Sequence, residues 1–102
     1  MKSRNFGEEL IEFGNRLKQL RKLRKLKLLD LEVLSGVNDS DISRYERGKE
    51  NIEFYTIYKL ARALDVEIMH LYDYNGPLPD NTNFQGVASF THKKKVTKKR
   101  KR

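Results

Sequence analysis

Apolar residues near the start of the chain recur with spacings of 4, 3, 4 and 3, which places them on one face of an amphipathic helix. They are Phe6, Leu10, Phe13, Leu17 and Leu20. Asn5 is a candidate N-cap for this helix, and Glu8 and Glu9 suit the positive end of its dipole. We expect the helix to run to about residue 24 or 25, with its apolar face in a hydrophobic core.

Two shorter helices follow, and glycines end them. The first is expected over residues 28–35, ended by Gly36, because glycine readily adopts the left-handed conformation of a helix C-cap. Asn38 can cap the next helix, and Asp41 stands at the reciprocal position of a capping box, with Asp in place of the usual Glu. Gly48 ends this helix. Two short helices joined by such a tight turn form a helix-turn-helix candidate.

Helical spacing of apolar residues predicts a fourth helix, and a short fifth helix is expected from residue 67 to about 72. The apolar positions of the fourth helix are Phe54, Ile57, Tyr58, Leu60, Ala61 and Leu64. Strand-like alternation does not persist anywhere, so the sequence predicts an all-α fold of five helices. A glycine and two prolines at residues 76–79 then forbid regular helix. They divide the chain into a helix-turn-helix domain over 1–76 and a linker or arm with a Lys/Arg-rich tail over 77–102.

The positive charge of the chain is concentrated at its end. The net charge is +8, and residues 81–102 hold 8 basic and no acidic side chains, so residues 1–80 sum to zero. From Lys93 the sequence is a basic block, expected to be disordered on its own. Residues 77–92 are polar with isolated apolar residues, and they either pack as an arm on the domain or a partner, or remain loose. The charge of the tail indicates a nucleic-acid partner, which the family resemblance described below narrows to a sequence-independent DNA arm, or the tail is a solvated segment with no specific role.

Composition excludes several other classes of protein. The 102 residues suffice for one domain with a modest core. The chain has no cysteine and its two histidines, His70 and His92, are isolated, so neither a metal site nor a cofactor is expected. No apolar run approaches the roughly 18 residues of a membrane span, and the N-terminus turns acidic where a signal peptide is apolar. No nucleophile or phosphate-loop motif points to an enzyme, and no small-molecule ligand is expected.

Three segments carry the most specific sequence signal. They are Phe13-Gly14-Asn15-Arg16-Leu17-Lys18-Gln19-Leu20-Arg21, then Gly36-Val37 followed by Ile42-Ser43-Arg44-Tyr45-Glu46-Arg47-Gly48, and finally Leu60-Ala61-Arg62-Ala63-Leu64-Asp65-Val66. In this order and spacing they resemble the lambda-repressor/Cro-type helix-turn-helix regulators, or XRE family, over about residues 13–72. The resemblance implies five helices, with the third in the major groove of double-stranded DNA, and a prokaryotic, cytoplasmic, nucleoid-associated regulator.

The resemblance also implies roles for individual residues. It pairs Arg21 with Glu46 in a partly buried ion pair that ties the first helix to the third. The residues implied to face base edges are Asn38, Asp39, Ser40 and Arg44. Those implied to lie near phosphates are Arg16, Lys27, Ser43, Arg47, Lys49 and Asn51. Such regulators commonly bind as homodimers on palindromic operators, with two third helices in successive major grooves about 34 Å apart.

The sequence departs from the family pattern in two places. Family members usually begin the second helix with a Ser or Thr cap and then a phosphate-binding Gln, where this chain has Lys27 and Leu28. The first turn of the third helix carries Asp39 and Asp41, which phosphates repel. These carboxylates either stabilise the helix N-terminus, by about 0.3–1 kcal/mol each, or Asp39 accepts from cytosine N4, or the helix faces a protein.

Other side chains have alternative interpretations. Arg44 either binds guanine O6 and N7 bidentately or pairs with Asp41 three residues earlier. Four tyrosines are expected in the core and at a dimer surface rather than as base-stacking platforms: Tyr55, Tyr58, Tyr72 and Tyr74. His70 is expected at the surface or an interface.

Two functions compete at this point. The first is a sequence-specific DNA-binding transcriptional regulator, a homodimer on a palindromic operator. The second is a protein-interaction module of the same fold, an antitoxin-like partner, with weak DNA binding through the tail. The resemblance favours the first, whereas Leu28 and the acidic first turn of the third helix favour the second.

Overall fold

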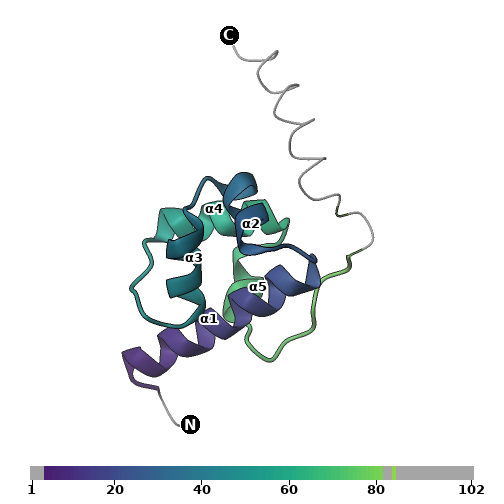
Figure 1. The fold of residues 1–102 in the computed structure, drawn as a ribbon. Helices are drawn as coiled ribbons and strands as arrows, with labels where there is room; N and C mark the ends of the chain where they lie inside the picture. The colour runs from purple at the N-terminus through teal and green to yellow at the C-terminus, as the bar shows by residue number, and fades with distance from the viewer. Residues whose placement is uncertain (1–3, 82–83, 85–102) are drawn as a thin grey trace.

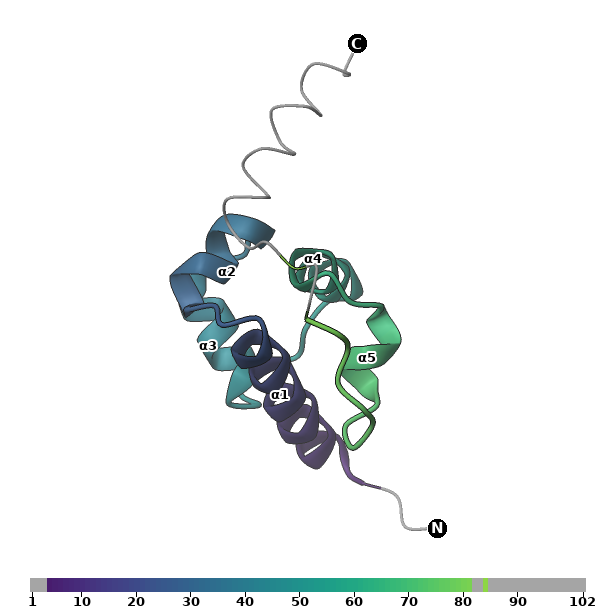
Figure 2. The ribbon, with the colours of Figure 1, turned by 90° about the vertical axis from the view of Figure 1, so that its right-hand side faces the viewer.

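The computed structural model describes residues 4–81 and residue 84. Over these residues it contains five helices and no strand: α1 (Phe6–Leu23), α2 (Leu28–Ser35), α3 (Asp39–Glu46), α4 (Phe54–Leu64) and α5 (Ile68–Tyr72). Figure 2 shows α2 and α3 on one side of α1 and α5 on the other, while α4 packs against both α2 and α5 (Figure 1). The prediction of an all-α fold with five helices is confirmed. None of the helices in the described part has the length and apolar character needed to cross a bilayer.

The helix ends follow the local chemistry of the chain. The Asn5 side chain accepts from the Glu8 N–H at 2.8 Å and the Glu8 carboxylate accepts from the Asn5 N–H at 3.0 Å, a complete capping box. Gly36 ends α2 in the predicted left-handed conformation, with φ 79°. Gly48 has φ 69°, and a Cβ there would lie 2.8 Å from the Cα of Ile11. Backbone conformation and available space therefore both require glycine at residue 48.

The N-terminus of α3 differs from the prediction at one position. Asn38 caps it through its side-chain oxygen, as predicted. The reciprocal capping-box bond from Asp41 was a wrong prediction, because the Asp41 carboxylate pairs with Arg44 instead. The free N–H of Asp39 is bonded from outside the helix, by Glu32 Oε1 of α2 at 2.9 Å. The cap supplied by α2 links the two helices of the helix-turn-helix directly.

The hydrophobic core draws on all five helices. Its fully enclosed apolar side chains are Leu17, Leu20, Leu31, Ile42, Leu60, Leu64 and Leu71. The inward face of α1 begins only at Phe13: Leu10 is half-buried and Phe6 is 61% exposed, although both continue the apolar spacing. Figure 1 shows the start of α1 projecting beyond the other helices, and Phe6 in this first turn is not part of the core.

Residues 73–81 and Phe84, which follow α5, lie on the surface of the domain. Arg24, buried at the C-cap of α1, donates to backbone oxygens at the end of α4, to the Asp80 carbonyl and to the Asn81 side chain, at 2.8–2.9 Å. Its guanidinium carbon lies 4.8 Å from the ring centroid of Phe84. The packed structure thus extends past residue 76, the expected domain boundary, to Asn81 and Phe84. Residues 85–102, which include Val87, Phe90 and the basic tail, lie outside the described residues.

Candidate nucleic-acid interface

Two features hold α3 rigidly against α1. Arg21 Nε donates to Glu46 Oε2 at 2.7 Å and Arg21 Nη2 donates to Glu46 Oε1 at 2.9 Å, and both side chains are at most 10% exposed. This is the ion pair that the family resemblance implies. A Cβ added to Gly14 would lie 2.6 Å from the Glu46 carbonyl oxygen and closer still to that of Tyr45. The backbones of α1 and α3 therefore touch only because residue 14 has no side chain.

The turn between α2 and α3 is fixed by its own bonds. Val37 is buried in the core, and its N–H donates to Ser35 Oγ at 3.0 Å. The Ser35 hydroxyl in turn donates to the Leu31 carbonyl at 2.7 Å. Together with the cap from Glu32 to Asp39, these bonds link α2 to α3 and fix the turn between them.

The four residues expected to face base edges gather at the N-terminal end and along one side of α3. Asn38 and Ser40 are exposed, whereas Asp39 and Arg44 are half-buried. Ser40 and Arg44 are four residues apart and so lie on the same side of the helix. Asn38 Oδ1 is occupied by the backbone N–H and hydroxyl of Ser40, which leaves the Asn38 amide group as its exposed donor.

Arg44 is bonded to two carboxylates. Its Nε donates to Glu50 Oε2 at 2.9 Å, and its Nη2 donates to Asp41 Oδ1. The pair with Asp41 is one of the two alternatives that the sequence offered. The three side chains are 39–43% exposed, so each pair contributes at most about 1 kcal/mol and can exchange for another partner. Burial and, secondarily, the Asp41 and Glu50 carboxylates raise the pKa of the neighbouring Tyr45 hydroxyl.

Five of the six residues expected near phosphates lie at the surface. Lys27 sits at the N-cap of α2, and the other four follow one another from α3 into the loop before α4: Ser43, Arg47, Lys49 and Asn51. All five are exposed except Ser43, which is half-buried and accepts from Arg47 Nη1 at 2.9 Å. Three of these side chains, Lys27, Arg47 and Lys49, carry a positive charge in addition to that of Arg44.

Arg16 was wrongly predicted to contact phosphate. It is 2% exposed, and its Nε donates to the His70 carbonyl at 2.7 Å. Its remaining nitrogens donate to Gln19 Oε1 and to the carbonyls of Gly76 and Pro77. The physical reason is that α5 and the segment after it cover this side of α1 and present backbone oxygens to it. His70, expected at the surface or an interface, is half-buried, and its Nδ1 accepts from the Glu67 N–H at 3.0 Å.

Glu32 and Glu50 were not identified from the sequence. Both contacts cross a turn, so helical spacing does not predict them. A signal for Glu50 was present in Gly48, whose left-handed conformation reverses the chain, so that the Lys49 N–H donates to the Arg44 carbonyl at 3.0 Å. For Glu32 no local signal exists, because its bond to the Asp39 N–H depends on the angle between α2 and α3.

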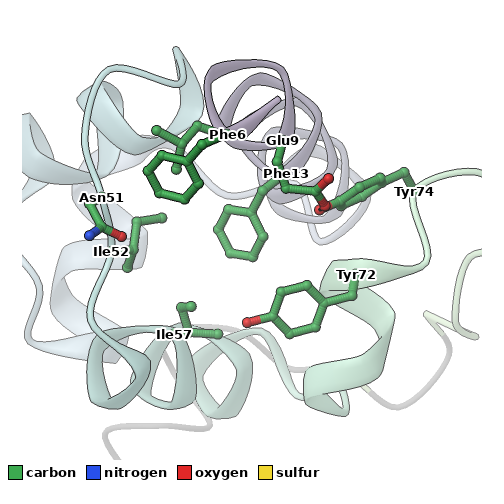
Figure 3. Close-up of a pocket in the computed structure, with 9 residues that line it drawn as sticks. Phe6, Glu9, Phe13, Asn51, Ile52, Ile57, Tyr72 and Tyr74 are labelled. Atoms are coloured by element: carbon green, nitrogen blue, oxygen red, sulfur yellow. The ribbon is translucent and has the colours of Figure 1, made fainter. Parts of the chain in front are cut away.

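A separate open pocket of about 170 Å³ lies between α1, α5 and the start of α4 (Figure 3). Most of its lining is apolar: Phe6, Leu10, Phe13, Ile52, Ile57 and Tyr72. At its edge the Tyr74 hydroxyl donates to Glu9 Oε2; burial first, and then this hydrogen bond, raise the pKa of Tyr74. Of the residues expected to touch DNA, only Asn51 borders this pocket.

The described residues thus form a small helical domain whose third helix is braced from α1 and α2 and lined by polar and basic side chains, the architecture of a DNA-binding helix-turn-helix. The sequence matches the helix-turn-helix family model HTH_3 over residues 17–71, more than half of the chain. The protein therefore belongs to this family of lambda-repressor-like DNA-binding transcriptional regulators.

Two solved structures show the same relationship. One is the restriction-modification controller protein C.AhdI from Aeromonas hydrophila, with 41% identity and a TM-score of 0.62 over 63% of this chain and 97% of that one. The other is an HTH_3 family transcriptional regulator from Vibrio cholerae, with 27% identity and a TM-score of 0.66; the match covers 70% of this chain and 40% of that one. No curated protein sequence matches.

Proposed function

We propose that this protein is a sequence-specific transcriptional regulator that binds a palindromic DNA operator as a homodimer in a prokaryotic cytoplasm. In each subunit α3 enters the major groove, where Asn38, Ser40 and Arg44 reach base edges. Lys27, Arg47 and Lys49 contact the flanking phosphates. The similarity to C.AhdI, a restriction-modification controller protein, supports a regulatory role for this chain.

The observation that carries this proposal is the bracing of α3. The ion pair between Arg21 and Glu46, the contact at Gly14 and the cap from Glu32 fix this helix while its opposite side stays in solvent. Recognition of base edges requires such fixed placement, because each good bidentate contact discriminates by about 1–3 kcal/mol only when its geometry is correct.

The homodimer is proposed from the surface of α4 and α5. Large apolar side chains there are 45–69% exposed: Phe54, Tyr55, Tyr58, Met69 and Tyr72. The Tyr55 and Tyr58 rings stack on each other with centroids 6.3 Å apart. Because monomeric proteins seldom expose so many large apolar side chains together, a second copy is the partner that we expect to cover them.

The test is a selection of random duplexes by the full chain and by a chain ending at Phe84, at stepped salt concentrations. We expect both to enrich the same palindromic motif with two chains per duplex. The shorter chain should bind it more weakly and with a smaller salt dependence, because it lacks the basic tail. Enrichment of no motif by either chain would falsify the proposal.

The second candidate is an antitoxin-like protein-interaction module. Leu29 and Val33, one turn apart on α2, are 58% and 49% exposed, which gives the helix beside α3 an apolar outer side. Purification of the tagged full chain from its native cells distinguishes the candidates. A stoichiometric protein partner that is lost on Leu29→Ser and Val33→Ser substitution supports this module, whereas its absence supports the regulator alone.

A further inference from the structure

Arg44 is the only arginine within α3, and its side chain is bonded to two carboxylates. Its Nε meets Glu50 at 2.9 Å and its Nη2 meets Asp41, so that one edge of the planar guanidinium is occupied. Within the described part of the chain, its hydrogen bonds run through Nε and Nη2, and none is found at Nη1. The two carboxylates occupy the edge formed by Nε and Nη2, and the end of the guanidinium at Nη1 is left for another acceptor.

The two carboxylates reach Arg44 by different routes. Asp41 lies one turn earlier on α3, three residues away. Glu50 lies in the loop after α3, and the reversal of the chain at Gly48 brings it back onto the helix. An arginine bonded both to its own helix and to the following loop samples fewer orientations than a free surface arginine does.

The charge of this group also matters for DNA binding. Asp41, Arg44 and Glu50 together carry a charge of −1, on the side of α3 that the proposed function turns toward DNA. A phosphate carries a full negative charge and is repelled by this group, whereas guanine O6 and N7 are neutral acceptors. The arrangement therefore opposes contact of Arg44 with phosphate more strongly than contact with a base edge.

We propose that Asp41 and Glu50 are positioning residues for Arg44: they keep it from binding phosphates and present its free end to a base, which makes Glu50 a determinant of operator specificity. This inference rests on the proposed function. It assigns to Glu50 the opposite effect from the basic loop residues beside it, because Glu50 lowers affinity for DNA in general and raises discrimination between sequences.

The test uses the full chain, the palindromic duplex that it selects and a random duplex of equal length. Glu50→Gln keeps the shape of the side chain and removes its charge. We expect its affinity for the random duplex to rise several-fold and the ratio of the two dissociation constants to fall about 3- to 10-fold, part of the discrimination that one bidentate contact supplies. The salt dependence of random-duplex binding should steepen by up to about one ion, because Arg44 becomes free to reach phosphate.

Glu53→Gln is the matched control. Glu53 is exposed, lies three residues further along the chain at the N-cap of α4, and makes no side-chain cap bond there. The Glu53→Gln substitution changes the net charge by the same amount as Glu50→Gln and leaves the contacts of Arg44 in place. We therefore expect the ratio of the dissociation constants for the random and the selected duplex to stay within about twofold of that of the unmodified chain. Asp41→Asn should move the ratio in the same direction as Glu50→Gln.

A double-mutant cycle makes the test specific to Arg44. In an Arg44→Ala background, Glu50→Gln should leave the ratio unchanged, since there is no arginine left to position. The inference is overturned if Glu50→Gln and Glu53→Gln change both affinities equally, or if Glu50→Gln still lowers the ratio without Arg44. If the unmodified chain does not discriminate between the duplexes, the proposed function and this inference both fail.

Discussion

The arginines of α1 and those of α3 differ in what surrounds them. Arg16, Arg21 and Arg24 are at most 8% exposed and bond to carbonyl oxygens and to one carboxylate inside the domain. Arg44 and Arg47 bond only to side chains at the surface. The comparison shows that the buried arginines bond the elements of the domain to one another, with Arg21 bonding α1 to α3, whereas the exposed ones stay available at its surface.

The role of the buried arginines is tested most strongly at Arg21. Arg21→Ala leaves the Glu46 carboxylate buried and unpaired, so we expect the free energy of unfolding to fall by about 3–5 kcal/mol. Urea denaturation followed by circular dichroism measures it. Lys18→Ala, at an exposed position of the same helix, is the control and should change stability by less than about 0.5 kcal/mol. Equal effects of the two substitutions would remove the distinction between the two groups of arginines.

Gly14→Ala tests the same bracing without touching a charge. The added methyl overlaps the carbonyl oxygens of Tyr45 and Glu46, so α3 must move away from α1. We expect a loss of about 1–3 kcal/mol in stability and weaker operator binding. Gly7→Ala, whose added methyl meets nothing closer than 3.5 Å, should instead stabilise α1 by about 0.5–1 kcal/mol. A neutral Gly14→Ala would mean that α3 is not confined by this contact.

Arg44→Ala tests the role of the exposed arginines. We expect the free energy of unfolding to fall by no more than about 1–2 kcal/mol, because both ion pairs of Arg44 are solvent-exposed. Discrimination between operator and random duplex should fall by about 5- to 150-fold. Fluorescence anisotropy with both duplexes measures this, and Arg62→Ala, an exposed arginine of α4, is its control. A larger loss of stability with unchanged discrimination would place Arg44 with the buried arginines.

Arg47→Ala should have the smallest effect. Its side chain bonds only Ser43 at the surface, so we expect unchanged stability and a modest, equal loss of affinity for operator and random duplexes. The slope of log K against log salt should become shallower by about 0.9, as for one lost phosphate contact. A loss confined to the operator duplex would instead mean that Arg47 reads sequence.

The sequence predicted the parts of the fold that local chemistry determines. Asn5, Gly36 and Asn38 end or begin helices as predicted, because caps depend on the few residues around them. Phe6 was expected in the core and is exposed. Apolar spacing shows which residues share a face of a helix, but it does not show where the neighbouring helices end.

The site residues were harder to predict for a related reason. Arg16 has the same charge as Arg47, and only the position of α5 decides that one is buried and the other exposed. Glu50 was missed because its partner is reached across a chain reversal, and Glu32 because its partner belongs to another helix. Spacing within a helix carries no information about such contacts.

The bracing of α3 has a thermodynamic consequence for association with DNA. Because the helix is already immobilised by Gly14, Glu32 and the ion pair of Arg21 with Glu46, its ordering entropy is lost during folding and not on binding. The domain should dock as a rigid body. Calorimetry should then give a heat-capacity change no larger than the apolar area of the contact predicts, without the additional negative change that coupled folding produces.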